Sequence, residues 1–101
     1  MTGEGKSYYY GNNNLEYEGE YLNGKWNRKG KEYYYNGKIK FEGEYLEGKM
    51  WTGIGYNNDG QKEFEIINGK GYVKEFDEKG KLEYEGEYLN GKRYGRGKKY
   101  E

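Results

Sequence analysis

The chain has 101 residues, and its 18 lysines and arginines balance 18 aspartates and glutamates, so the formal net charge is zero. A neutral chain of this length forms one small domain and has no overall attraction for nucleic acids or anionic membranes. Because it contains neither cysteine nor histidine, it lacks disulfides, the common nucleophile–base pairs and the usual transition-metal ligands.

In chain order, the sequence predicts nine short antiparallel strands and no helix. Pairs such as Asn23-Gly24, Asn36-Gly37 and Asp59-Gly60 supply the positive φ angles that tight hairpin turns require. Between such turns, segments such as 15–21 alternate apolar and charged residues, which is typical of a strand with two different faces. We place the strands near residues 4–10, 15–22, 29–35, 38–46, 53–57, 62–67, 70–77, 81–89 and 95–100.

One phrase recurs along the chain. Tyr-Glu-Gly-Glu-Tyr at 17–21 returns at 84–88, and Phe-Glu-Gly-Glu-Tyr stands at 41–45; each copy is followed by Leu, then Asn or Glu, then Gly-Lys. In a degenerate copy of this phrase that begins at Phe64, Ile66 replaces the glycine. We therefore expect the third repeat to be irregular. Such recurrence is typical of proteins in which each hairpin contacts mainly its neighbours. We therefore predict one all-β domain over 1–101, an elongated single-layer antiparallel meander of hairpins, with a partial repeat at 3–16, repeats at 17–40, 41–63 and 84–101, and a degenerate repeat at 64–83.

Aromatic residues are the main apolar material of the chain. They make up 20% of it, and fifteen of them are tyrosines. Aliphatic residues are scarce, so rings with polar tips must provide most of the core. No apolar run is long enough for a signal-peptide core or a membrane span. We expect a cytoplasmic location, with a membrane-peripheral one as the alternative.

The alternation assigns the rings to one face of the sheet and the carboxylates to the other. In the first full repeat, Tyr17, Gly19 and Tyr21 point one way and the intervening glutamates the other. The glycine leaves room for a neighbouring ring to lie flat on the backbone. The rings form either a core ladder of cross-strand contacts or a partly exposed groove. We place the two tryptophans in or beside hairpin loops. The candidate binding surface is Tyr17, Tyr21, Trp26, Tyr45, Trp51, Tyr84 and Tyr88.

The charged residues give two further patterns. The glutamates form a regular face that we interpret as solvated and paired with lysines on adjacent strands, each exposed pair contributing only about 0–1 kcal/mol. Glutamate content alone would allow a two-carboxylate glycosidase, but this face offers no pocket to raise the pKa of one carboxyl. A basic cluster near the end is either a site for phosphate or a lipid head group or a solvated last hairpin. Its residues are Lys92, Arg93, Arg96, Lys98 and Lys99.

The segment from Tyr17 to Lys25 resembles the opening of a MORN repeat, whose pattern runs Tyr-Glu-Gly-Glu-Trp, two residues, Gly-Lys and then Gly-x-Gly. The best match is 84–97, where tyrosine stands at the usual tryptophan position. Residues 31–37 also resemble the bacterial MORN-variant repeats of some predicted antitoxins. The resemblance covers essentially the whole chain and implies an elongated, curved antiparallel sheet of hairpins.

MORN-repeat proteins act as scaffolds, dimerisation surfaces and membrane-proximal modules, so the resemblance implies binding. We expect a non-enzymatic scaffold for protein–protein interaction, self-association included, in which the exposed sheet ends at 4–10 and 95–100 could pair with another chain. Two alternatives stay open: an adaptor for anionic membrane phospholipid, and an aromatic groove for a small ligand. We expect no catalytic residue, no cofactor and no metal site, and we do not expect nucleic acid as a partner.

Overall fold

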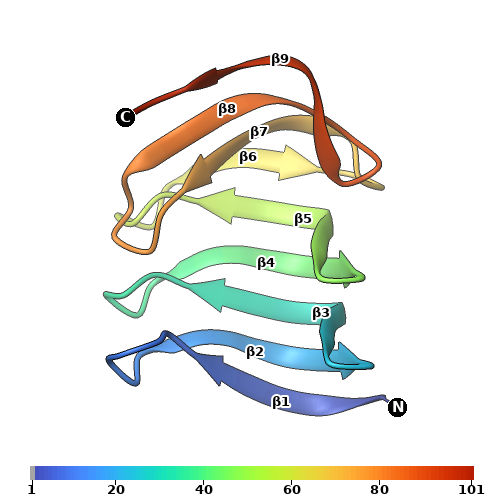
Figure 1. Cartoon of the computed structure of the whole chain (residues 1–101), viewed down its shortest axis with the longest axis vertical. Coiled ribbons are helices and arrows are strands. Elements are labelled where there is room, and N and C mark those ends of the chain that lie inside the picture. The colour runs from blue at the N-terminus through green and yellow to red at the C-terminus, as the bar shows by residue number, and fades with distance from the viewer. Residues whose placement is uncertain (1) are drawn as a thin grey trace.

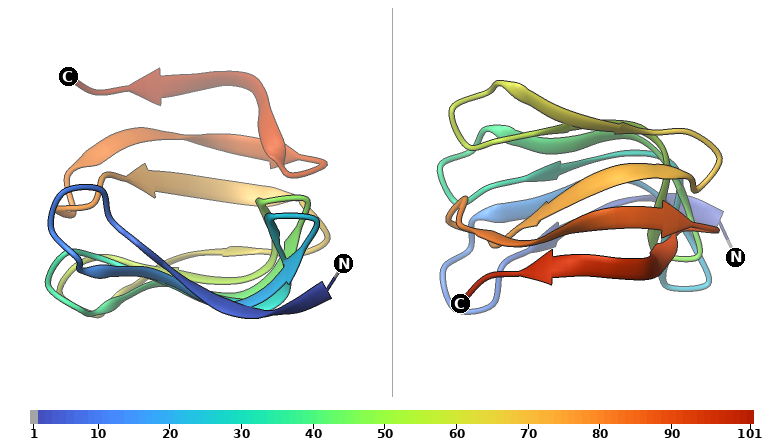
Figure 2. Two further views of the ribbon diagram at one scale, coloured as in Figure 1. Left: turned by 60° about the horizontal axis from the view of Figure 1, so that its bottom comes forward. Right: turned by 90° about the horizontal axis from the view of Figure 1, so that it is seen from above.

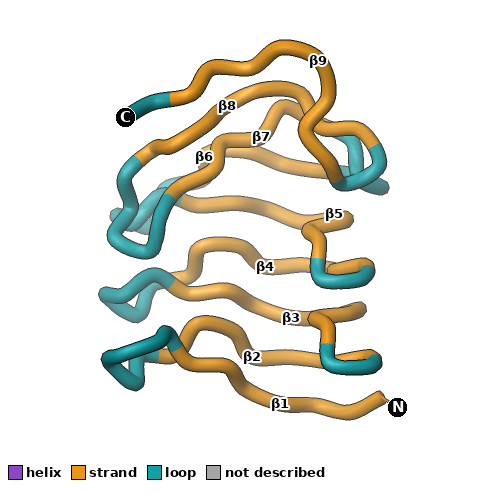
Figure 3. The backbone as a smooth tube through the Cα atoms, in the orientation of Figure 1, coloured by secondary structure: helices purple, strands orange, loops and turns teal. Residues whose placement is uncertain are grey.

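The computed structural model describes residues 2–101, which form nine strands in the order in which they follow along the chain (Figures 1 and 3). Each strand pairs antiparallel with its sequence neighbour, as predicted, except the sixth and seventh. These two share no ladder, and the turn between them contains an isolated bridge between Ile67 and Lys70. The strands are β1 (Thr2–Tyr8), β2 (Leu15–Leu22), β3 (Lys25–Tyr33), β4 (Ile39–Leu46), β5 (Lys49–Tyr56), β6 (Lys62–Ile66), β7 (Gly71–Phe76), β8 (Leu82–Leu89) and β9 (Lys92–Lys99).

The prediction of a single elongated layer is wrong. Strands β1–β6 form one sheet and β7–β9 a second, and the chain turns after β6 so that the second sheet rises over one face of the first (Figure 2). The domain measures 35 × 27 × 21 Å, with a radius of gyration of 13.1 Å. A globular domain of about 100 residues has a radius of gyration near 13 Å, so the molecule is no more extended than an ordinary small domain.

A stripe of glycines at one register position lets the rings pack on the backbone. A Cβ atom on Gly30 would lie 2.5 Å from Cζ of Tyr17, and one on Gly97 would lie 2.6 Å from Cε1 of Tyr84. Glycine therefore does make room for a ring, as predicted, although the ring covers the glycine of the neighbouring strand most closely. Along β1–β5 the glycines that face one another are Gly5, Gly19, Gly30, Gly43 and Gly53.

The glycine stripe ends where the first sheet ends. Ile66 stands opposite Gly53, and Val73 stands opposite Gly86, at positions that are glycine in the other repeats. Both side chains are fully buried and join the core cluster with the rings. Two β-branched side chains need volume that a glycine pair does not, so the core between the two sheets takes them up. The third repeat is irregular, as Ile66 predicted, and its irregularity is the turn from one sheet to the other.

The hairpin turns are stacked into ladders at both ends of the strands. At one end, two-residue turns such as Asn23-Gly24 and Asn90-Gly91 have positive φ at both residues, as hairpins of this length require. At the other end, asparagine side chains join successive turns: Asn14 Nδ2 donates to Tyr35 O, Asn36 Nδ2 to Asn58 O, and Asn58 Nδ2 to Lys79 O. The abundant asparagines therefore hold neighbouring repeats together.

Two details of the predicted strands need correction. β3, β5 and β9 begin three or four residues earlier than predicted, directly after their two-residue turns. Trp26 and Trp51 consequently lie within β3 and β5 and not in loops. The strict alternation is also broken, because the register shifts by one residue just before the first ring of each repeat. The residues that this bulge leaves without a cross-strand partner are Glu16, Lys40, Glu63 and Glu83.

Candidate functional site

Three of the seven predicted surface rings are core residues. Tyr17, Tyr45 and Tyr84 are buried, so they cannot form an exposed groove. Tyr17 stacks on Trp26 with centroids 4.4 Å apart and meets Tyr45 edge-on at 5.3 Å. Such pairs contribute about 0.5–1.5 kcal/mol each beyond their buried area. The core-ladder interpretation therefore applies to these rings.

The other four predicted rings are partly exposed. Trp26 and Tyr88 line a cleft between the two sheets, and Tyr21 packs against the edge of the core. Trp51 lies elsewhere, against the turn backbones of Gly69 and Gly91. Of the predicted surface, therefore, the structure brings only Trp26 and Tyr88 together in a cavity.

The cleft has a volume of about 290 Å³ and combines rings with charges. The fold-back of β7–β9 over the ring-bearing face of β1–β6 creates it, so its lining comes from strands that are distant in sequence. Its charged lining residues are Glu32, Lys40, Lys49, Lys74 and Glu75. None of these five was predicted as a site residue.

Glu32 lies in the row of rings, between Tyr17 and Phe41 on the neighbouring strands. Burial raises the pKa of Glu32, although the charge of Lys40 and a hydrogen bond from Tyr45 partly oppose the shift. Tyr45 Oη donates to Glu32 Oε1 at 2.8 Å. Glu32 is not one of the glutamates assigned to the solvated acidic face, so the expectation for that face did not cover this carboxyl. The glycine-to-glycine register could have found Glu32, because it places this residue two positions from Gly30 on the ring side.

Glu75 carries the opposite shift. Burial alone would raise the pKa of Glu75, but hydrogen bonds from Arg93 and Tyr88 lower it below its ordinary range. Arg93 donates from Nε and Nη2 to the two carboxylate oxygens at 2.8 and 2.7 Å, a bidentate geometry that favours the ionised form. The cleft thus holds one carboxyl biased toward the neutral state and one held ionised.

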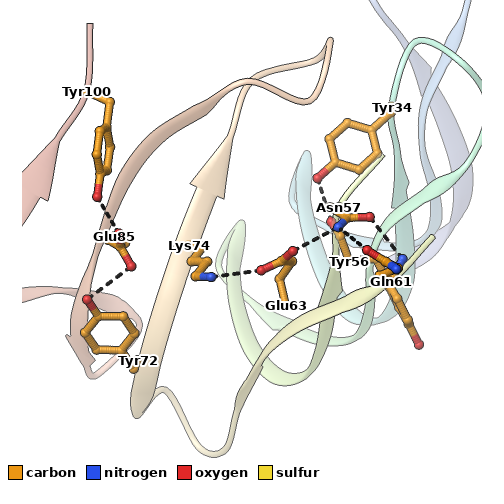
Figure 4. Close-up of polar contacts among 9 residues, drawn as sticks. All are labelled: Tyr34, Tyr56, Asn57, Gln61, Glu63, Tyr72, Lys74, Glu85 and Tyr100. Carbon is orange, nitrogen blue, oxygen red and sulfur yellow. Dashed lines mark hydrogen bonds and ion pairs between the residues drawn. The ribbon is translucent and has the colours of Figure 1, made fainter. Parts of the chain in front are cut away.

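Beside the cleft, an ion pair connects the two sheets. Lys74 Nζ of β7 lies 2.9 Å from Glu63 Oε1 of β6, and Asn57 Nδ2 donates to Glu63 Oε2 at 2.9 Å (Figure 4). These bonds lower the pKa of Glu63. Glu63 reaches Lys74 because it is a bulge residue and does not follow the alternation that sends other glutamates to the outer face.

We expect Glu32→Gln to stabilise the domain at high pH. The raised folded-state pKa means that ionisation of Glu32 opposes folding, so its contribution is best below the unfolded pKa and is lost as pH rises through the folded pKa. Glutamine keeps an acceptor for Tyr45 and never ionises. Urea unfolding should therefore show equal stability for both proteins near pH 4 and a more stable variant at pH 8. A variant that is less stable at pH 8 would contradict this assignment.

The predicted basic cluster is divided between two faces of β9. Arg93 is bound to Glu75 and lies 4.0 Å above the ring of Tyr84. Lys98 stands opposite Glu85 and Lys99 opposite Tyr84, and adjacent residues of a strand point to opposite faces. Lys92, Arg96, Lys98 and Lys99 are exposed, and the alternation places Lys99 on the other face of the strand from Arg96 and Lys98. A solvated last hairpin describes them better than an anion pocket.

A second concave feature crosses the outer face of β1–β4. This groove of about 790 Å³ has the glycine stripe as its floor. Charges of alternating sign follow one of its sides: Lys6 lies 3.9 Å from Glu18, and Lys31 lies 3.7 Å from Glu42. Glu18 and Glu42 of the acidic face are thus paired with lysines of adjacent strands, and such exposed pairs contribute little to stability.

The remaining candidate is the free edge of β9. Among the described residues, β9 has β8 as its one hydrogen-bonded neighbour, and all of its residues are exposed. β9 lies at the opposite end of the molecule from β1, the other terminal strand (Figure 1). Tyr100 N, just after β9, donates to Glu83 O in β8. Successive N–H groups of a strand alternate between its two sides, so the N–H of Lys99 points to the free edge.

Comparison with protein-family models, with curated proteins and with solved structures finds no match. None of residues 2–101 belongs to a helix with the length and hydropathy needed to cross a membrane.

Proposed function

We propose that the chain is a non-enzymatic, MORN-like protein-interaction module that binds an extended segment of a partner along the edge of β9. The observation that carries the proposal is the eight-residue strand with one side unpaired and every residue exposed. Such an edge is a template for an additional strand, because its backbone N–H and C=O groups offer ready hydrogen bonds.

The positive charge of the β9 edge favours binding of a selective partner over general aggregation. β9 carries Lys92, Arg93, Arg96, Lys98 and Lys99, and like charges opposite one another destabilise a strand pair. Two copies of β9 therefore repel each other. A strand of opposite charge is attracted, and the attraction weakens as salt rises.

Two substitutions at Lys99 test the edge directly. Lys99→Pro removes the outward N–H, whereas Lys99→Ala removes the same charge and keeps the N–H. We expect partner proteins captured from source cells by the wild type to be retained by Lys99→Ala and lost by Lys99→Pro, in a quantitative mass-spectrometric comparison. Equal capture by Lys99→Pro, with its fold verified by urea unfolding, would refute edge binding.

A small ligand in the cleft is the second candidate function. Its support is the combination of the partly exposed Trp26 with Glu32 and Lys40 in one cavity of about 290 Å³. Because Trp51 lies outside this cavity, a Trp51→Phe variant reports on Trp26 alone. Ligand binding in the cleft should shift its fluorescence, and a ligand that binds without such a shift would contradict this location.

The lipid alternative has weaker support, because Arg93 is already bound to Glu75 and the remaining cations are spread over both faces of β9. It predicts salt-sensitive binding to vesicles of anionic phospholipid. Co-sedimentation that is equal for anionic and neutral vesicles would dismiss it.

A further inference from the structure

β9 is a second copy of β3. In both strands a ring of the preceding strand covers a glycine: Tyr17 covers Gly30, and Tyr84 covers Gly97. The flanking contacts also recur. Tyr33 Oη donates to Glu18 as Tyr100 Oη donates to Glu85, and Trp26 stacks on Tyr17 where Arg93 lies over Tyr84. The glycine register therefore aligns Arg96, Gly97 and Lys98 with Lys29, Gly30 and Lys31.

β3 differs from β9 in having a neighbour on both sides. Its second neighbour is β4, which places Glu44 opposite Lys29, Gly43 opposite Gly30 and Glu42 opposite Lys31. Lys31 Nζ lies 3.7 Å from Glu42 Oε2. The molecule thus contains, inside its first sheet, an example of the strand that completes an edge of the β9 type.

We propose that the β9 edge binds an acidic extended segment of the type aromatic-Glu-Gly-Glu-aromatic. In the register of β3 and β4, its two glutamates oppose Arg96 and Lys98, and its glycine opposes Gly97. This proposal deepens the proposed function and rests on it, since it names the class of partner for the same edge.

The edge of β1 is a poorer match for such a segment. β1 aligns Glu4, Gly5 and Lys6 with Lys29, Gly30 and Lys31, because Gly5 pairs with Gly19 as Gly30 pairs with Gly43. A Glu-Gly-Glu segment there would meet one like charge and one opposite charge, whereas on β9 it meets two opposite charges. The alignment also argues against pairing between the β9 edge and β1 of a second copy of the chain. If Gly5 stood opposite Gly97 in such an antiparallel pair, Lys6 would stand opposite Arg96, and the two like charges would repel.

A peptide with the sequence of residues 38–47, Lys-Ile-Lys-Phe-Glu-Gly-Glu-Tyr-Leu-Glu, tests the proposal in an NMR titration of the protein. Binding should shift and protect the outward amides of β9, above all those of Gly97 and Lys99. A control peptide with Glu42→Lys and Glu44→Lys has the same strand propensity and should bind about tenfold more weakly, since two favourable charge pairs become unfavourable.

Two protein variants locate the effect. Arg96→Gln with Lys98→Gln removes the two opposing cations and should abolish the preference for the acidic peptide. The control variant, Lys92→Gln with Lys99→Gln, removes the same amount of charge. Its two positions align with Lys25 and Glu32 of β3, which have no acidic residue opposite them on β4. This control should therefore retain the preference for the acidic peptide. Urea unfolding verifies that both variants fold.

The outcomes separate the two levels of the proposal. Equal binding of both peptides at β9 would overturn the acidic class and leave edge binding intact. Shifts confined to β1 would overturn the assignment of the acidic segment to β9. Absence of any shift at β9 with peptide up to about 1 mM would count against the edge as a strand-binding site, and with it against the proposed function.

Discussion

Replacing Gly30 with valine is expected to remove a large part of the stability of the domain. A Cβ at this position would lie 2.5 Å from Cζ of Tyr17. The Tyr17 ring cannot move aside, because it is fully buried between Trp26 and Tyr45. We expect a loss of about 3–5 kcal/mol, a large part of the about 5–15 kcal/mol that stabilises a typical domain. Urea unfolding followed by tryptophan fluorescence measures it.

Gly3→Val is the matched control. Gly3 also lies in a strand, but no atom outside Gly3 and its two chain neighbours lies within 4 Å of the position of its Cβ, and valine favours strand conformation. The stability should therefore change by no more than about 0.5 kcal/mol. Similar losses for Gly3→Val and Gly30→Val would mean that glycine serves backbone flexibility and not ring packing, against the explanation given for the stripe.

Much of the fold could be predicted because the turns and the glycine–ring phrase are local signals. Asn23-Gly24 and its counterparts determine where strands end, and the spacing of the phrase gives nine strands in consecutive order. The early starts of β3, β5 and β9 could not be predicted, because these strands have register shifts of their own against β2, β4 and β8 that absorb the extra residues. A bulge leaves no mark in composition, and it reverses the face of one residue, as at Lys40 and Glu63.

Only aromatic residues of the cleft could be predicted from the sequence, because its charged residues come together through long-range contacts. Trp26 and Tyr88 are notable in the sequence because they belong to the repeated phrase or stand beside it. The spacing from Gly30 places Glu32 on the ring side, but nothing local in the sequence marks Glu32 or Glu75 as a cleft residue. Only the fold-back of β7–β9 brings the two into one cavity. Opposite pKa shifts in two carboxyls result from this long-range contact, which no local pattern contains.

The fold-back itself depends on Ile66, and Ile66→Ala is expected to destabilise the domain by about 2–5 kcal/mol. Ile66 is 0% exposed and occupies the register position that is glycine in the earlier repeats. Alanine would leave a cavity beside the buried Val73 where the two sheets meet. Within residues 2–101, β6 and β7 share no strand ladder that could compensate for the lost packing.

The adjacent isoleucine provides a control within the same turn. Ile67 is 56% exposed, so Ile67→Ala should change the free energy of unfolding by no more than about 0.5 kcal/mol. If the two substitutions have equal effects, the junction is held by the turn and not by the buried side chain. If only Ile66→Ala lowers the free energy of unfolding, the presence of isoleucine where the earlier repeats have glycine explains both the end of the first sheet and the position of the second. The free β9 edge then follows from the same change, because the second sheet begins only after this junction and ends at β9.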